Sequence, residues 1–339
     1  MLAFALFSLL PLCASAATLA TFHDVPLAPS PLPAPGGRSN ADAIVSAFGD
    51  LSRNTKWNLI KSIPLEGDVG EVESMVRIND DRFVLAWGNW TVPTKAYGKD
   101  AQGNTIYING TDRTPGQGIS HLTVFDGNGT RLATATLNDV DATEYHVGGM
   151  DYDGEYLWTE LAQYRPNSTA TAIRVDPYTY DVTPIVHIND HSGGIIHDTK
   201  KRTITMLNWG SRNASRFGLD SHDFYRQPKA VFPNPSSFVD YQDCKWLGYP
   251  TKWDRKKSVA LCSGVAVYQF GDKITELGGI ALVDVDTMVP LIEVPMNLLT
   301  PAGLSMNQNP VDVDVVDGKM RLFFAPDLQN GTIFVYESV

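Results

Sequence analysis

His146-Val147-Gly148-Gly149 recurs as His191-Ser192-Gly193-Gly194, 45 residues later. Each copy is followed by an apolar run that predicts a strand, residues 155–158 after the first copy and 202–207 after the second. Propeller blades repeat with a period of about 45 residues and contain several short strands each. The repeat therefore predicts a β-propeller in which the two histidines point from adjacent blades toward one central axis.

Strand and turn patterns fill almost the whole chain from Trp57 onward. The runs 120–125 and 131–137, for example, are joined by Asp126-Gly127-Asn128-Gly129, which is typical of a hairpin turn. Grouping such runs gives five blades, or six if residues 212–240 contain a further irregular sheet. The last blade is one strand short, and residues 57–65 supply that strand and close the ring. The predicted fold class is all-β, a single propeller over residues 57–339.

Three segments precede the predicted propeller. Residues 1–16 predict a signal peptide, because the apolar run Leu2–Leu12 is too short to span a bilayer and ends in Ala14-Ser15-Ala16. Residues 17–38 are rich in proline and predict an extended segment. Residues 39–56 predict a short helix, over 39–53, followed by a linker. We therefore expect a secreted, extracellular monomer with no membrane partner.

Two further patterns agree with secretion. Cys13 leaves with the signal peptide, so Cys244 and Cys262 remain as a pair whose separation suits a disulfide between neighbouring strands of one blade. Asn-x-Ser/Thr sequons for N-glycosylation are numerous and fall mostly in predicted turns. Their acceptor residues are Asn89, Asn109, Asn128, Asn167, Asn213 and Asn330.

Charge and missing motifs exclude several function classes. The net charge is -11 and no cluster of Lys or Arg is present, so nucleic acid is not an expected partner. The chain has no glycine-rich phosphate loop, no nucleophile elbow and no His-Glu-x-x-His helix. A small molecule or a glycan is the expected ligand.

Candidate site residues follow from the repeat. The first residues of the innermost strands line the mouth of a propeller funnel, and one polar residue per blade falls there: Glu71 or Glu73, His146, His191, Asp243 and Asn309. Two neighbouring loops add Tyr164 with Arg165, and Trp209 with Arg212. Arginine binds carboxylates in a bidentate manner and aromatic faces pack on sugar rings. We assign catalytic roles to His146, His191, Tyr164, Arg165, Arg212 and Asp243, and ligand contacts to Glu73, Trp209 and Asn309.

These residues are compatible with several functions. The leading prediction is an enzyme that acts on extracellular carbohydrate, either a lyase with Tyr164 or a histidine as base, or a hydrolase with paired carboxylates. The carboxylates considered for the hydrolase are Asp151, Asp153, Glu160, Asp198 and Asp243. The alternatives are a small-molecule enzyme, lactonase-like or in secondary metabolism, and a propeller that only binds its ligand. An axial Ca²⁺ or transition metal could be held by Glu73, His146, His191, Asp243 and Asn309. Paired glycines could also simply let strands approach a crowded axis.

Several motifs together carry a family resemblance. They are HVGGMDYDGEYLW, QYRPNS, HSGGIIHDT, NWGSR, NPSSFVDYQDC, CSG, GG-x-x-LVD and TP-x-G-x-x-x-NQNP. With these motifs the chain resembles an uncharacterised family of secreted propeller-like proteins from fungi and actinobacteria. The resemblance covers most of the chain after about residue 57 and implies a propeller and a secreted setting. One departure is Gln163, where the pattern has an acid before Tyr-Arg-Pro.

Overall fold

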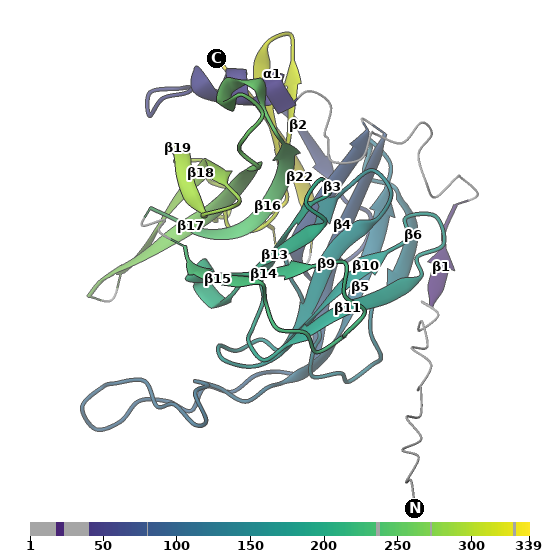
Figure 1. Ribbon diagram of the computed structural model, residues 1–339, viewed down its shortest axis with the longest axis vertical. Helices are drawn as coiled ribbons and strands as arrows, with labels where there is room; N and C mark the ends of the chain where they lie inside the picture. The colour runs from purple at the N-terminus through teal and green to yellow at the C-terminus, as the bar shows by residue number, and fades with distance from the viewer. Residues whose placement is uncertain (1–17, 24–40, 80, 235–237, 272, 328–329) are drawn as a thin grey trace, which may run out of the picture.

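The structure is a computed structural model that describes residues 18–23, 41–79, 81–234, 238–271, 273–327 and 330–339. These residues form five antiparallel sheets, each with at least four strands (Figure 1). Each sheet is one blade, so the predicted five-bladed propeller is confirmed. The predicted signal peptide and most of the proline-rich segment lie outside the described residues.

The first three blades follow one another along the chain. Blade 1 contains β3 (Glu71–Asn79), β4 (Arg82–Val92), β5 (Gln117–Phe125) and β6 (Arg131–Thr136), with β1 (Leu19–Thr21) paired to β6 at its outer edge. Blade 2 contains β7 (His146–Val147), β8 (Asp151–Tyr152), β9 (Leu157–Ala162), β10 (Ala170–Val175) and β11 (Val182–Ile188). Blade 3 contains β12 (Gly194–Asp198), β13 (Thr203–Leu207), β14 (Asn213–Gly218) and β15 (Ala230–Pro233).

The last two blades include the closure of the ring. Blade 4 contains β16 (Asp240–Gly248), β17 (Val259–Phe270), β18 (Lys273–Asp284) and β19 (Val289–Met296). Blade 5 contains β20 (Val311–Val316), β21 (Lys319–Phe324), β22 (Thr332–Ser338) and, from the start of the propeller, β2 (Trp57–Pro64). β2 pairs with β22 from Trp57 opposite Ser338 to Pro64 opposite Thr332, so the predicted closure by the N-terminal strand is confirmed.

The alternative with six blades is wrong. In the described part of residues 212–240, β14 and β15 pair with each other and complete blade 3. Phe224 lies in the connection between β14 and β15, where its carbonyl accepts a hydrogen bond from the His187 N–H.

The core lies between the blades. Successive side chains of a strand point to opposite faces of a sheet, so each blade supplies apolar residues to both of its neighbours. Ile195, for example, packs in the cluster between blades 2 and 3, and Ile196 packs in the cluster between blades 3 and 4. Five such clusters of buried residues fill the five interfaces.

One α-helix joins this core. α1 (Ala41–Gly49) lies inside the range 39–53 for which the sequence predicts a helix, and its Ile44, Val45 and Phe48 are buried in the cluster between blades 4 and 5. Asp42 in its first turn accepts hydrogen bonds from the backbone N–H and hydroxyl of Thr251. None of the helices in the described residues is long and apolar enough to cross a membrane.

The predicted disulfide is confirmed. Cys244 of β16 and Cys262 of β17 are paired directly across neighbouring strands of blade 4, with Cα atoms 4.1 Å apart. All six sequon asparagines are exposed to solvent. Asn89 and Asn213 lie in strands β4 and β14 rather than in turns.

The repeated Gly-Gly pairs bring two blades together at the axis. The segment between β7 and β8 leaves the blade 2 sheet, and the Gly149 N–H donates to the Gly193 carbonyl of blade 3 at 3.1 Å. A Cβ at Gly148 would lie 2.1 Å from Glu160 Oε1 and 2.9 Å from the Gly193 carbonyl carbon. Only glycine fits there, because any side chain would collide with Glu160 and with the neighbouring backbone.

Two extensions project from one side of the propeller. They are the connection between β4 and β5, residues 93–116, and the far end of the β17–β18 hairpin (Figure 1). Both leave the ring beside the first residues of inner strands, because Glu71 pairs with Gly88 and Asp240 pairs with Val265. We call residues 93–116 the arm.

Candidate functional site

A pocket opens where the innermost strands begin. Its lining includes Glu71 and Glu73 of β3, His146 of β7, Asp240 of β16 and Asn309 just before β20. The volume is about 310 Å³. We call it the axial pocket.

The axial pocket contains a pair of acidic side chains. Glu71 and Glu73 are two residues apart on β3, and both line the pocket although the pairing with β4 shifts between Val72 and Ser74. Burial and the neighbouring Glu73 carboxylate raise the pKa of Glu71 to about 7, and the two side chains share a hydrogen bond. Two carboxylates in contact cannot both be ionised at low cost. Glu71 therefore gains and loses its proton close to neutral pH.

His146 is placed between this acidic pair and an aromatic ring. Its Nε2 is 3.4 Å from Glu73 Oε1. Burial lowers the pKa of His146, but Glu73 and Glu71 outweigh burial and the net pKa is raised. Its ring stacks on Tyr164 with centroids 4.6 Å apart. Burial and the two glutamates raise the pKa of Tyr164 to about 12, so its hydroxyl stays protonated and can donate to a ligand.

His191 is fixed in one orientation. Its Nδ1 lies 2.8 Å from the Gln163 carbonyl, so Nδ1–H donates and Nε2 keeps a lone pair. Burial and the nearby His146 lower the pKa of His191 to about 3, and the imidazole is neutral at ordinary pH. The two histidine rings, predicted to meet at the axis, have centroids 5.8 Å apart. The departure at Gln163 thus lies beside the site, although the bond uses only its backbone carbonyl.

Trp209 and an arginine from the arm complete the aromatic wall. The Trp209 ring is 4.8 Å from His191 and 5.5 Å from Tyr164, centroid to centroid. The Arg113 guanidinium lies over both the Tyr164 and the Trp209 rings, at 5.4 and 5.0 Å. Asp112 holds it there through bonds of 2.8 and 2.9 Å. Sequence reasoning missed Arg113, because only the tertiary path of the arm brings it to the site.

Six of the nine residues assigned to the site from the sequence line this pocket. They are Glu73, His146, Tyr164, His191, Trp209 and Asn309. The amide Nδ2 of Asn309 and the Oε1 of its neighbour Gln308 are buried and form no hydrogen bond within the described residues.

The two arginines expected in the pocket do not line it. Arg165 Nε donates to Gln163 Oε1 at 2.8 Å and braces its own loop. Arg212 is exposed, forms an ion pair with Asp240 and donates to the Gly210 carbonyl at 2.6 Å. Both side chains stabilise local structure: Arg165 forms a hydrogen bond within its loop, and Arg212 forms an ion pair with Asp240 of β16.

Asp243, expected at the funnel mouth, is fully buried beneath it. It accepts a bond of 2.5 Å from Lys245 Nζ and further bonds from the backbone N–H groups of Met150 and Val311. Burial raises its pKa to about 6 even though Lys245 lowers it. Asp243 thus joins three blades at the axis and is not open to a ligand.

The other carboxylates considered for catalysis are also outside the axial pocket. Glu160 is fully buried near Asp243, and burial raises its pKa well above the usual value. Asp151 accepts from the backbone of His197 and Trp246, and Asp198 accepts from the hydroxyls of Tyr249 and Ser258. Asp153 faces a different pocket.

The proposed axial metal site lacks its ligands. Asp243 is bonded to Lys245, and among the residues that the structure describes no three His, Cys, Asp or Glu side chains come together as a metal site. The axial ring does not fit a metal ion.

Comparison with known families gives a clear result. A family of unknown function, DUF6454, matches residues 33–339. The chain belongs to this family. The comparison with curated proteins returned no match.

Solved structures similar to this DUF6454 protein are distant. The WD40 β-propeller domain of Doa1 has a TM-score of 0.37 at 10% identity and covers 83% of this chain and 96% of its own. YCF48 bound to D1 peptide has a TM-score of 0.33 at 11% identity, and the match covers 82% of this chain and 95% of the YCF48 chain. A chain of a nidogen/laminin complex has a TM-score of 0.35 at 9% identity, and the match covers 67% of this chain and 80% of that chain. The blade assignment of this DUF6454 protein therefore depends on its own sheet topology.

Three acids in the axial pocket were not assigned from the sequence. Glu71 was considered only as an alternative to Glu73, although both lie at the start of β3. Asp240 begins β16, and Glu276 is on β18 in the projecting hairpin. No sequence pattern points to Glu276 as a site residue, because its position depends on how far the β17–β18 hairpin extends beyond the ring.

Proposed function

We propose that this protein is a secreted hydrolase that cleaves a glycosidic bond of a neutral carbohydrate in the axial pocket. The observation that carries the proposal is the pair of carboxylates, Glu71 and Glu73, that lines the axial pocket together with Tyr164 and Trp209, where burial and Glu73 raise the pKa of Glu71 to about 7. A carboxylic acid whose pKa is raised toward neutrality is what a glycosidase requires as its general acid.

The pocket suits a neutral ligand better than an acidic one. Its ionisable lining includes four acids, Glu71, Glu73, Asp240 and Glu276, whereas Arg165 and Arg212 lie outside. A uronate carboxylate would be repelled there. Arg113, which lies over the aromatic wall, is already bonded to Asp112, so the lyase mechanism would lack a free arginine to neutralise the carboxylate. We therefore favour hydrolysis over elimination.

The walls and volume fit a sugar. Aromatic faces such as those of Tyr164 and Trp209 pack on the apolar faces of sugar rings, and Asn309 offers an unpaired buried amide to a hydroxyl. The volume of about 310 Å³ is at the small end of ligand pockets, which span about 300–1,000 Å³. The pocket suits a small glycoside or one end of a chain.

The reaction needs one proton donor and one acceptor. In our proposal Glu71 donates its proton to the glycosidic oxygen, and the bond between that oxygen and the anomeric carbon breaks. A water attacks the anomeric carbon and gives its proton to Glu276, on blade 4. The negative charge of Glu73 raises the pKa of Glu71, and the neighbouring His146 lowers it. The Tyr164 hydroxyl donates a hydrogen bond to a sugar hydroxyl.

Secretion is part of the proposal. It is supported by the signal-peptide pattern of residues 1–16, by the Cys244–Cys262 disulfide and by the exposure of all six sequon asparagines.

A panel of neutral chromogenic aryl glycosides tests the reaction. We expect at least one to be hydrolysed by the wild type, and the rate to fall by a factor of about 10² or more in Glu71→Gln. Asp317→Asn, which also removes one carboxylate but lies on an exposed turn, should keep the wild-type rate. Equal rates in wild type and Glu71→Gln would refute the assignment, and binding of a glycoside without turnover would favour a propeller that only binds.

A further inference from the structure

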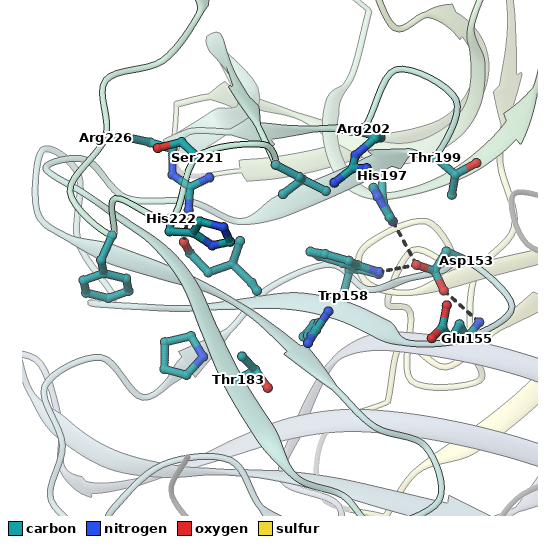
Figure 2. Close-up of a pocket in the computed structure, with 15 residues that line it drawn as sticks. Asp153, Glu155, Trp158, Thr183, His197, Thr199, Arg202, Ser221, His222 and Arg226 are labelled. Atoms are coloured by element: carbon teal, nitrogen blue, oxygen red, sulfur yellow. Dashed lines mark hydrogen bonds and ion pairs between the residues drawn. The ribbon is translucent and has the colours of Figure 1, made fainter. Parts of the chain in front are cut away.

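A second, larger pocket lies between blades 2 and 3. It has a volume of about 680 Å³ and shares no lining residue with the axial pocket. It lies near the ends of the inner strands, since Asp153 follows β8 and His197 is the penultimate residue of β12. The axial pocket is where those strands begin, so the two sites are at different ends of the propeller. We call the second one the side pocket (Figure 2).

The side pocket contains one arginine, Arg174, whose charge is poorly compensated, and a second, Arg226, that is held in place by the backbone. The guanidinium of Arg174 lies over the Tyr156 ring at 4.3 Å, and its buried Nε makes no hydrogen bond within the described residues. Arg226 donates from Nε, Nη1 and Nη2 to the carbonyls of Asp223, Gly218 and Ile185, at 2.6, 2.7 and 2.5 Å. Carbonyl oxygens fix the position of Arg226, and its charge interacts with the nearby Asp223 carboxylate.

The acidic side chain deepest in the pocket is already engaged. Asp153 lies 3.1 Å from His197 Nδ1 and accepts 2.7 Å from Trp158 Nε1, in addition to two backbone N–H groups (Figure 2). Its charge is therefore satisfied locally. The same contact fixes the His197 ring by Nδ1 and leaves Nε2 as the free nitrogen.

The charge balance of the lining favours an anion with a single charge. The lining contains three arginines, Arg174, Arg202 and Arg226, and two acids, Asp153 and Glu155, so its formal charge is +1 with the histidines neutral, in a chain whose net charge is -11. Arg202 is also 3.1 Å from Asp220, but both side chains are more than 60% exposed, so this pair contributes little. A carboxylate matches one positive charge, whereas a phosphate monoester carries nearly two negative charges at neutral pH.

The remaining wall is apolar. It is formed by Pro184, Ile185, Leu219 and Phe224, with the Trp158 ring beside His197. In Figure 2 His222 and Arg226 lie on one side of the pocket, and His197 and Asp153 lie on the other. A ligand that spans the pocket can thus reach apolar surface and cationic groups together.

From these observations we propose that the side pocket binds a small monocarboxylate that carries an apolar ring. The carboxylate bonds the free donors of Arg174, and the ring packs on the wall formed by Ile185, Leu219 and Phe224. This site is independent of the proposed reaction in the axial pocket.

Isothermal titration calorimetry on the full chain tests the proposal with benzoate as the probe. Benzamide is the matched neutral ring and phenyl phosphate is the matched dianion. We expect benzoate to bind and benzamide not to bind. Arg174→Gln should weaken benzoate by about tenfold or more, because a charge-assisted hydrogen bond is lost. Arg53→Gln, an exposed arginine outside the pocket, should bind as the wild type does.

A second variant gives a change of opposite sign. Glu155→Gln removes a competing negative charge from the lining, so it should strengthen benzoate binding severalfold. Glu71→Gln in the axial pocket should leave benzoate binding unchanged. Equal binding of benzoate and benzamide, no binding of benzoate, tighter binding of phenyl phosphate, or an unaltered affinity in Arg174→Gln would each overturn the proposal.

Discussion

Replacing Glu71 by Gln should stabilise the fold and remove the proposed activity at the same time. The pKa of Glu71 is raised from 4.5 to about 7 by burial and by Glu73. Each pKa unit corresponds to about 1.4 kcal/mol, so ionising Glu71 in the folded protein costs about 3 kcal/mol. Because the side chain is partly open to solvent, we expect about 2 kcal/mol to be recovered in the variant. The Gln amide can still donate to Glu73.

The pH dependence fixes the sign of this effect. The folded-state pKa is above the unfolded one, so the wild type has its full stability from this group below pH 4.5 and loses it as the pH rises to about 7. Glu71→Gln should therefore unfold at higher urea than the wild type at pH 8 and at similar urea at pH 4. Asp317→Asn serves as the control, with no gain at pH 8. If Glu71→Gln is no more stable than the wild type at pH 8, burial and Glu73 do not raise the pKa of Glu71.

Other predictions concern the axis, the arm and the processing of the chain. Lys245→Met leaves Asp243 buried without its cation and should lower the free energy of unfolding by about 3–5 kcal/mol, measured by urea denaturation; a loss below about 1 kcal/mol would contradict the buried ion pair. Arg113→Gln should raise KM for a glycoside severalfold with little change in kcat, because the guanidinium covers the aromatic wall without touching the acid pair; unchanged KM would remove the arm from the site. Intact-mass measurement after deglycosylation should show a chain that begins near Ala17, and a mass that includes Met1 would refute the signal peptide. With a reductant the same measurement should show a gain of two hydrogens from the Cys244 disulfide.

The sequence was sufficient to predict the fold because local patterns determine propeller blades. The repeat at His146 and His191 gave the blade period, and the unpaired strand at residues 57–65 gave the closure. The alternative with six blades was wrong because the irregular connection within residues 212–240 resembles an additional sheet in its composition.

The candidate site was predictable where a residue is tied to the blade repeat, either at the start of an inner strand or, for Tyr164 and Trp209, in the loops after β9 and β13. His146 and Asn309 follow that rule, and so do Glu71 and Glu73. Asp243 also lies near the start of an inner strand, but its carboxylate is buried below the pocket, because it is bonded to Lys245 beneath the glycine pairs. Residues that reach the site on projecting loops, among them Arg113 and Glu276, depend on loop length and packing, which no periodic pattern records.

Hydrolysis in water enriched in ¹⁸O tests the central claim most directly. A glycan or glycoside that the wild type cleaves should yield a product with one ¹⁸O per broken bond by mass spectrometry, and Glu71→Gln should yield no product. Water is consumed at the anomeric carbon in our mechanism, so each new reducing end must carry the label. A product that is unlabelled and absorbs in the near ultraviolet, or equal labelling with Glu71→Gln, would contradict a hydrolase with Glu71 as its acid.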